Sequence, residues 1–163
     1  MSAFVLDCSI AAAWLFADEA RPETDNLLEH LRDHGADDGA GDGALVPNLW
    51  HLEVANVLLQ AEKRGRITAA QIAARLELLA SLHIVTDGET GPRAFWEILT
   101  LARAHTLTTH DAAYLELAIR RGVPLATQDK ALVRAAKSAL SPRLRRAKSG
   151  YVPAILERVA RGV

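Results

Sequence analysis

The chain has 163 residues and a formal net charge of −1, with 50% hydrophobic and 24% charged residues. This composition is typical of one globular domain and excludes a fibrous or disordered chain. The single cysteine, Cys8, excludes internal disulfide bonds and fits a reducing compartment. No apolar run approaches the ~20 residues that span a bilayer, and Asp7 interrupts the apolar N-terminal stretch. We therefore expect a soluble, cytoplasmic protein without a signal peptide.

Short apolar runs alternate with helical patterns along the chain. The apolar runs predict strands at residues 3–6, 44–46, 83–85 and 123–126. Helical periodicity and capping residues predict helices at residues 10–16, 22–32, 49–64, 68–82, 92–104, 109–121 and 130–138. Among the start signals, Ser9 can cap the first helix, and Thr68 with Gln71 forms a capping box. Thr108 or Thr109 caps the helix that ends at Gly122.

Strands of three or four residues separated by helices indicate a parallel sheet with helices on both faces. The expected fold is a three-layer α/β/α domain whose central sheet has four or five short strands. No linker or internal repeat divides residues 1–163. The acidic segment at 33–43 is interpreted as a surface loop, because its carboxylates lack calcium-loop spacing. Ligands of such folds bind beyond the carboxyl ends of the strands, which is where we expect a functional site.

Three acidic residues stand at predicted strand ends or helix starts. Asp7 follows the first strand, Asp129 follows the fourth, and Asp111 comes three residues after Thr108 at the start of a helix. Each position also suits an acid that caps a helix or complements its dipole. Capping alone therefore stays open as an alternative for all three.

Glu53 is not explained by capping. It lies in a largely apolar helical run at 49–59, with Leu49, Asn56 and Val57 one turn away. A carboxylate on such a face is costly to bury unless it is paired or bound to a cation. A local hydrogen bond with Asn56 is one explanation, and an ion shared with the other acids is the one that we favour.

Several other residues lie near the predicted site. Ser9 and Thr127 each stand close to a strand-end aspartate. Each hydroxyl residue either orients that aspartate by hydrogen bonding or simply caps a helix. Cys8 is interpreted as a packed residue, since no histidine partner for a nucleophile is indicated. The histidines show no zinc spacing, and only His110 is placed near the crevice. Core-facing helical spacing predicts packing rather than base stacking for Trp14, Trp50 and Trp96.

A run of basic residues follows the last predicted strand. Residues 130–149 contain no acid and seven cations: Lys130, Arg134, Lys137, Arg143, Arg145, Arg146 and Lys148. A solvated helix face and tail explains this run. The alternative is a strip that neutralises the phosphates of a nucleic acid, which needs only a few well-placed cations.

Four segments, in order, resemble the motifs of the PIN-domain family. The opening VLDCSIAAAWL resembles the first motif, in which an acid ends a strand and a hydroxyl residue follows two positions later. VPNLWHLEVANVL resembles the second motif, with Glu53 and Asn56 at the matching places. LTTHDAAYLELAIRRGVPLATQDKALVRAA resembles the third and fourth motifs, with Asp111 and Asp129. The resemblance covers residues 4–136 and is strongest to VapC-like toxins, the ribonuclease half of bacterial toxin–antitoxin pairs.

The resemblance implies strand order 3-2-1-4-5, a homodimer, magnesium or manganese, an RNA substrate and a small antitoxin whose tail occupies the acidic cleft. It implies that the catalytic and metal-binding residues are Asp7, Glu53, Asp111 and Asp129. The supporting residues are Ser9, Asn56 and Thr127. Two features depart from the family pattern. The loop at 33–43 is long, and residues 137–163 form a basic extension in which no fifth strand is recognisable.

The expected chemistry follows from charge. Two carboxylates ~4 Å apart repel by about 4 kcal/mol at an effective dielectric of 20, so four of them need a counter-ion. Hard oxygen ligands select Mg²⁺ or Mn²⁺, which activates water for attack on a phosphodiester. We expect a metal-dependent endoribonuclease in which Asp7 and Asp129 bind the ion directly. Glu53 and Asp111 complete the site directly or through water.

Two other functions stay open. The first is a magnesium-binding signalling module similar to a phosphoreceiver, which needs an acceptor aspartate at the end of a central strand. Asp87 follows the third predicted strand only loosely, and Glu53 has no role in such a module. The second is a catalytically idle PIN relative that binds RNA or a partner, and the presence of all four acids weighs against it.

Overall fold

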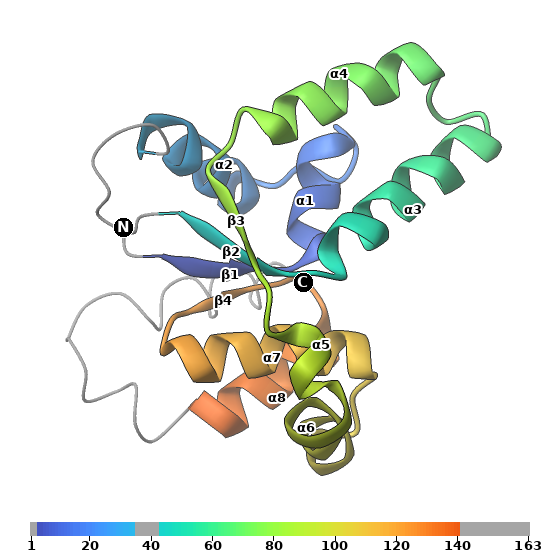
Figure 1. The fold of residues 1–163 in the computed structure, drawn as a ribbon. Coiled ribbons are helices and arrows are strands. Elements are labelled where there is room, and N and C mark those ends of the chain that lie inside the picture. The colour runs from blue at the N-terminus through green and yellow to red at the C-terminus, as the bar shows by residue number, and fades with distance from the viewer. Residues whose placement is uncertain (1–2, 35–42, 141–163) are drawn as a thin grey trace.

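The computed structural model describes residues 3–34 and 43–140. Its strands are β1 (Phe4–Leu6), β2 (Ala44–Pro47), β3 (Ile84–Asp87) and β4 (Leu125–Ala126). Neighbouring strands are parallel, in the order β3-β2-β1-β4 (Figure 1). The predicted parallel sheet and the order of its first four strands are confirmed. Most of the acidic loop, at 35–42, and the extension from residue 141 onward lie outside the described residues.

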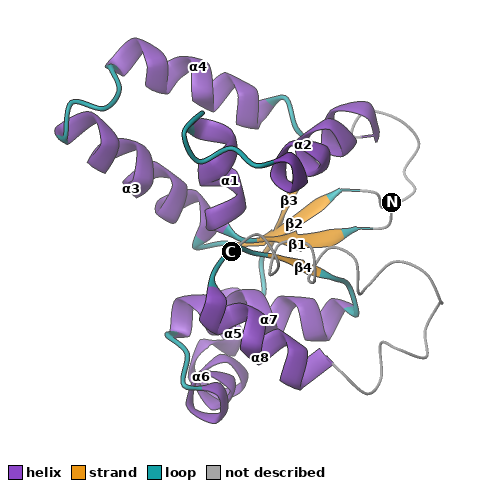
Figure 2. Ribbon diagram, turned by 180° about the vertical axis from the view of Figure 1, so that it is seen from behind, coloured by secondary structure: helices purple, strands orange, loops and turns teal. Residues whose placement is uncertain are grey.

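The helices form two layers, one on each face of the sheet (Figure 2). One layer contains α1 (Cys8–Leu15), α2 (Pro22–His34), α3 (Trp50–Lys63) and α4 (Ala69–Ala80). The other contains α5 (Thr90–Arg93), the π-helical turn η1 (Ala94–Ile98), α6 (Leu99–His105), α7 (Thr109–Arg121) and α8 (Lys130–Leu140). The predicted three-layer α/β/α fold is therefore confirmed. Within the described part of the chain, every helix is too short or too polar to cross a membrane.

The interior strand β1 is covered on both faces. Phe4, Val5 and Leu6 are at most 1% exposed, as expected for a parallel strand between two helical layers. Helix α7 packs against β1, β2 and β4, and its seven consecutive residues 112–118 are all buried. Three of the seven are alanines, whose small side chains let neighbouring elements approach α7 from every side.

Several helix ends follow the predicted signals. The capping box of α4 is present, because Thr68 and Gln71 exchange hydrogen bonds between side chain and backbone. Thr108 caps α7 by accepting a hydrogen bond from the backbone of Asp111. Gly122 ends α7 with a φ of 66°, a left-handed conformation that glycine adopts without strain.

The predicted helix after the third strand is interrupted by η1. Pro92 lies in the first turn of α5, where its missing N–H has no intrahelical acceptor to lose. The wider π-helical turn shifts side chains off the α-helical period, and Phe95 and Trp96 are 80% and 76% exposed. The predicted core position of Trp96 is therefore wrong. Trp50 is buried and Trp14 is partly buried, as predicted.

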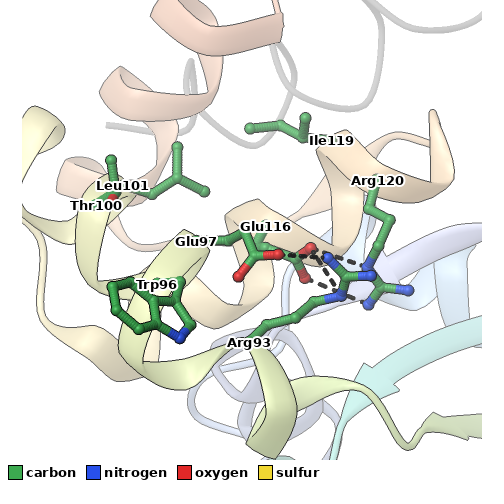
Figure 3. Close-up of a pocket in the computed structure, with 8 residues that line it drawn as sticks. All are labelled: Arg93, Trp96, Glu97, Thr100, Leu101, Glu116, Ile119 and Arg120. Carbon is green, nitrogen blue, oxygen red and sulfur yellow. Dashed lines mark hydrogen bonds and ion pairs between the residues drawn. The ribbon is translucent and has the colours of Figure 1, made fainter.

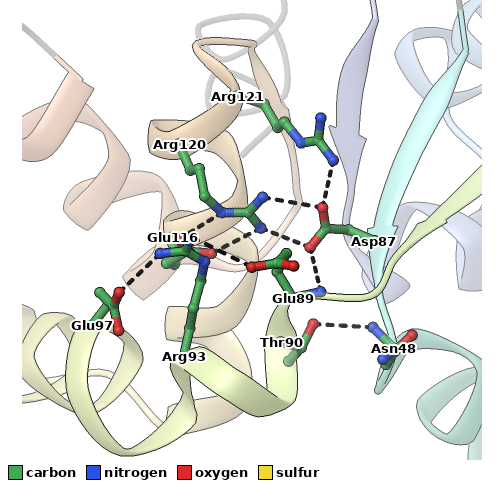
Figure 4. A network of polar contacts seen from close by, with 9 residues as sticks. All are labelled: Asn48, Asp87, Glu89, Thr90, Arg93, Glu97, Glu116, Arg120 and Arg121. Atoms are coloured by element: carbon green, nitrogen blue, oxygen red, sulfur yellow. Dashed lines mark hydrogen bonds and ion pairs between the residues drawn. The ribbon is translucent and has the colours of Figure 1, made fainter.

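The edge strand β3 is longer than predicted and ends in Asp87, which is 3% exposed. Arg120 donates hydrogen bonds to both carboxylate oxygens of Asp87, at 3.1 and 2.7 Å, and Arg121 donates another at 2.7 Å. These hydrogen bonds, with Arg120 contributing most, hold the pKa of Asp87 well below its usual range. Arg120 also pairs with Glu116, which lies 3.7 Å from Arg93 of α5 (Figure 4). The network connects the edge strand to the C-terminal end of α7 and to α5.

Candidate functional site

Asp7 directly follows β1, at the carboxyl end of the sheet, and is 6% exposed. Its Oδ2 atom accepts hydrogen bonds from Ser9 Oγ at 2.5 Å and from Thr127 Oγ1 at 2.6 Å. Burial raises the pKa of Asp7, the two hydroxyl groups oppose that rise, and the negative charge of Asp111 adds to it. No cation of the described residues pairs with this carboxylate.

The hydroxyl groups of Ser9 and Thr127 also bind the backbone of the loop after β4. Ser9 Oγ accepts a hydrogen bond from the backbone N–H of Gln128 at 2.9 Å. Thr127 Oγ1 accepts one from the backbone N–H of Asp129 at 3.0 Å. The two hydroxyls therefore orient Asp7 and fasten this loop to the start of α1.

The role of Ser9 differs from one of the predicted alternatives. Helix α1 begins at Cys8, and Asp7 rather than Ser9 occupies the N-cap position. Ser9 lies inside the first turn and its hydroxyl points back to the carboxylate. The predicted cap at Ser9 is therefore wrong, because Ser9 lies inside the helix and its oxygen accepts the backbone N–H of Gln128 instead of one from α1.

Cys8 is partly buried and packs against the core. Burial raises the pKa of its thiol to about 12, and the charges of Asp7 and Glu53 add to that rise. The thiol is therefore neutral at physiological pH, which suits a packed residue and not a nucleophile.

Glu53 lies in the first turn of α3, and its side chain is 26% exposed. Its Oε2 atom accepts a short hydrogen bond from the hydroxyl of Tyr114, and His110 Nδ1 lies 3.5 Å from Oε1. Burial raises the pKa of Glu53, and the charges of Asp7 and Asp111 raise it further. Tyr114 and His110 act in the opposite direction. The carboxylates of three separate elements thus influence one another.

Tyr114 is a site residue that the sequence analysis did not identify. It is 1% exposed and follows Asp111 by three positions in α7, so both side chains lie on the same stripe of the helix. Burial and the neighbouring Glu53 carboxylate raise the pKa of Tyr114, so its hydroxyl keeps its proton and remains a donor. A hydroxyl-bearing residue inside an otherwise apolar helical run was the signal that could have found it.

Asp111 takes part in the cap of α7, and its charge acts on the other carboxylates. Thr108 Oγ1 donates a hydrogen bond to Asp111 Oδ2 at 2.7 Å and accepts the Asp111 backbone N–H at 3.1 Å. Asp111 thus belongs to the cap of α7. Its charge also raises the pKa values of Asp7 and Glu53, so it belongs electrostatically to the same cluster.

Asp129 is exposed, and its Oδ1 atom accepts a hydrogen bond from the backbone N–H of Leu132 at 2.7 Å. Asp129 therefore caps α8, which was the alternative considered for it. Its backbone is close to Asp7 through Thr127, which bonds to both.

Asn56 lies outside the acidic cluster, whereas His110 lies beside Glu53. Asn56 is exposed and accepts a weak hydrogen bond from Gln60 Nε2 at 3.5 Å, so the anticipated bond to Glu53 is absent from the described contacts. His110 lies at the mouth of the cluster, where its side chain is 68% exposed. Of the predicted supporting residues, the structure places Ser9 and Thr127 in the cluster.

The donor set fits a hard divalent cation. The carboxylate oxygens of Asp7, Glu53 and Asp111 are ligands that Mg²⁺ and Mn²⁺ prefer, and their mutual repulsion favours a cation between them. Each carboxylate is at present held by hydroxyl or histidine donors. In residues 3–34 and 43–140, no three acidic, histidine or cysteine side chains stand close enough together to hold a metal ion. A bound ion therefore requires side-chain rotations that bring these oxygens closer together.

A hollow lies away from the acidic cluster, between α7 and the segment formed by η1 and α6. Its lining includes the apolar side chains of Trp96, Leu101 and Ile119, with Arg93 and Glu116 at one side (Figure 3). It contains none of the predicted site residues.

Comparison with known proteins identifies the family. Residues 4–138 match the PIN domain, and the chain belongs to this family. The family is a nuclease superfamily that typically uses divalent metal ions, so membership supports a nuclease function. The crystal structure of PAE2754 from Pyrobaculum aerophilum has a similar fold, with 24% sequence identity and a TM-score of 0.61. That alignment covers 98% of this chain and 90% of the other, and a comparison with curated proteins finds no match.

The structure argues against the receiver-like alternative, because Asp87 does not have the position of a phosphoryl acceptor. Asp87 ends the edge strand β3 and not a central strand, and its oxygens are occupied by Arg120 and Arg121. An aspartate in this arrangement is neutralised and buried, so it is unsuited to accept a phosphoryl group.

The first prediction tests the electrostatics of the cluster. Glu53→Gln removes one charge but keeps an oxygen that can accept the Tyr114 hydrogen bond. Without divalent ions at neutral pH, its free energy of unfolding should rise by on the order of 1 kcal/mol, since the repulsion from nearby carboxylates is relieved. Urea denaturation measures the change, and Glu62→Gln, on the same helix without a partner among the described residues, is the matched control.

The pH dependence gives a second reading of the same variant. The pKa of Glu53 is raised on folding, so its ionisation destabilises the folded protein above that pKa. The destabilisation disappears as the pH falls to the ordinary carboxyl value, about 4.3, where Glu53 is protonated. The gain from Glu53→Gln should therefore shrink between pH 7 and pH 4. A variant that is less stable than wild type at pH 7 would contradict the shared cluster.

Proposed function

We propose that this protein is a divalent-metal-dependent endoribonuclease. The observation that carries the proposal is the electrostatic coupling of three carboxylates from separate elements, Asp7 after β1, Glu53 on α3 and Asp111 on α7. Their charges raise the pKa values of Asp7 and Glu53 without a compensating lysine or arginine among the described residues. Such a cluster lowers stability unless a cation or substrate uses it. PIN-family membership and the all-oxygen donor set support the same function.

In this proposal, Asp7, Glu53, Asp111 and Asp129 hold Mg²⁺ or Mn²⁺ directly or through water. When bound, the ion lowers the pKa of water and stabilises the charge on the leaving oxygen of the phosphodiester. Asp129 contributes through its second oxygen, Oδ2, because Oδ1 caps α8.

The residues of the chain have separable tasks in the reaction. Ser9 and Thr127 hold Asp7 in one orientation through hydrogen bonds to Oδ2, so Asp7 would hold the ion through its other oxygen. Tyr114 holds Glu53 in place, and the raised pKa of Glu53 brings this carboxylate closer to the value that suits a proton acceptor near neutral pH. We assign to Glu53 the orientation of the attacking water.

The second prediction concerns metal binding and cleavage together. Asp7→Asn should lower manganese-dependent cleavage of a structured RNA by about 100-fold or more, since even outer-shell partners of metal ligands cost about 10- to 100-fold when removed. In the absence of RNA, a free ion concentration of 100 Kd should stabilise wild type by about 2.7 kcal/mol and Asp7→Asn far less. Gel assays of RNA cleavage and thermal melts measure the two effects.

The control for this prediction is Asp25→Asn, which removes an exposed carboxylate of α2 outside the cluster. It should leave both readouts unchanged. Cleavage that survives excess EDTA would contradict the metal mechanism. Metal-dependent stabilisation without cleavage of any RNA would favour the catalytically idle alternative.

We further propose that the protein is the toxin of a toxin–antitoxin pair, with a small antitoxin protein that occupies the acidic cleft. The support is the resemblance of the four motifs to VapC-like toxins, together with the acidic cluster. A partner that covers Asp7, Glu53 and Asp111 would block access of RNA to the carboxylates.

The third prediction tests the toxin role in cells. Expression of the chain alone should slow bacterial growth, and Asp111→Asn should relieve the effect at equal protein level, because it removes one charge of the cluster while keeping an acceptor for Thr108. Growth curves with immunoblots provide the measurement. Equal slowing by wild type and Asp111→Asn would reject the toxin role and leave a housekeeping nuclease.

A homodimer is the fourth expectation. The exposed aromatic side chains of Phe95 and Trp96, beside the apolar hollow against α7, support an association surface on η1. Sedimentation velocity at micromolar concentration should show a dimer of the full chain, and Trp96→Ala should shift the distribution towards monomer. A wild-type chain that sediments only as a monomer would contradict this expectation.

A further inference from the structure

Helix α8 carries cations on one face. Lys130, Arg134 and Lys137 follow one another at spacings of four and three residues, which aligns their side chains along one stripe. The opposite face is buried, with Leu132 and Ala136 at 0% exposure. The helix contains no acidic residue, so every charged side chain on its outer face is basic.

These three cations have no structural task in the described residues. Each is exposed, and none forms an ion pair or hydrogen bond with another described residue. Lys130 also occupies the first position of α8, where the helix dipole disfavours a positive charge. Some arginines of other elements are held in ion pairs, namely Arg66, Arg93, Arg120 and Arg121.

The stripe begins at the acidic cluster. Thr127 bonds both to Asp7 and to the backbone of Asp129, and Asp129 in turn caps the first turn of α8. Lys130 is therefore adjacent to the site, and Lys137 lies about 10 Å farther along the helix axis at 1.5 Å per residue. A polyanion that approaches a cluster of carboxylates is repelled by it, and nearby cations offset that repulsion.

We propose that the outer face of α8 binds the phosphodiester backbone of the RNA strand that enters the acidic cluster. This inference rests on the proposed nuclease function and names the surface that holds its substrate. The contacts are made to phosphates, so the surface binds RNA without regard to base sequence. Single-stranded DNA of the same sequence has the same phosphates and should bind through the same three residues.

The test measures the salt dependence of binding. Fluorescence anisotropy with a labelled, unstructured 20-nucleotide RNA, in EDTA and from 50 to 300 mM KCl, gives the slope of log K against log salt. Each phosphate contact to a single strand contributes about 0.7 to this slope. The variant K130Q/R134Q/K137Q should therefore lower the slope by about 2, and the same-sequence DNA should show the same change.

A second triple variant, K63Q/R64Q/R103Q, is the matched control. It removes the same net charge from exposed cations of α3, the turn after it and α6. It should lower the slope far less than the α8 variant. If the α8 triple variant does not fold, Arg134→Gln and Lys137→Gln singly should each lower the slope by about 0.7.

The possible outcomes distinguish a failure of the RNA-binding surface on α8 from a failure of the proposed nuclease function. An unchanged slope in the α8 variant, an equal fall in both triple variants, or no RNA binding by wild type would overturn the surface. Because binding is measured in EDTA, a failure of wild type to cleave RNA in manganese would overturn the proposed nuclease function without altering this result. Cleavage by wild type with an unchanged slope in the α8 variant would overturn the surface alone.

Discussion

The site depends on burying the carboxylate of Asp7 at the end of the interior strand without giving it a basic partner. Burying an isolated charge costs free energy, and here hydrogen bonds from hydroxyl groups offset that cost. Ser9 and Thr127 lie 118 residues apart in the sequence, so Asp7 is satisfied only when β1 and β4 are paired. The same two hydroxyls position the loop that carries Asp129 and starts α8. One buried carboxylate therefore connects strand pairing, the start of a helix and the geometry of the site.

Helix α7 has opposite electrostatics at its two ends. Near its N-terminus, Asp111 and Tyr114 face carboxylates that are left without arginines. Near its C-terminus, Arg120 and Arg121 form ion pairs with Asp87. About 13 Å of helix separates these regions, at 1.5 Å per residue. The chain thus has arginines available and uses them at the sheet edge, while the negative potential of the cluster is retained at a cost in stability, as is common for functional sites.

The sequence was sufficient for features determined by local signals or by strand-end position. The parallel sheet between two helical layers, the capping box of Thr68 and a cap at Thr108 or Thr109 were predicted from local patterns of alternation and capping. The order of the first four strands was instead an implication of the resemblance to the PIN-domain family, and the structure confirms it. Electrostatic coupling of Asp7, Glu53 and Asp111 agrees with the expectation that acids at strand ends meet. The arrangement of all four acids around an ion stays a prediction.

Two errors came from non-local contacts and one from local helix geometry. Tyr114 was missed because its partner, Glu53, is 61 residues away and nothing nearby in the sequence marks the pair. Capping stayed open for Ser9 because its oxygen accepts from the backbone of Gln128, 119 residues away, a contact that could not be recognised without the fold. Trp96 was placed in the core because helical periodicity assumes 3.6 residues per turn, which the π-helical turn η1 does not follow.

The enclosure of α7 has a consequence for the way the domain opens. Helices surrounded on all sides exchange their amide hydrogens only when the whole domain unfolds, whereas exposed termini and loops open locally. Seven consecutive residues of α7 are buried, and Tyr114 is one of them. The backbone that carries Tyr114, next to Asp111, should therefore belong to the last part of the molecule to open. A partly unfolded form that keeps its core but has lost Asp111 and Tyr114 from the acidic cluster should then not be populated. The cluster should disappear in the same cooperative transition as the fold.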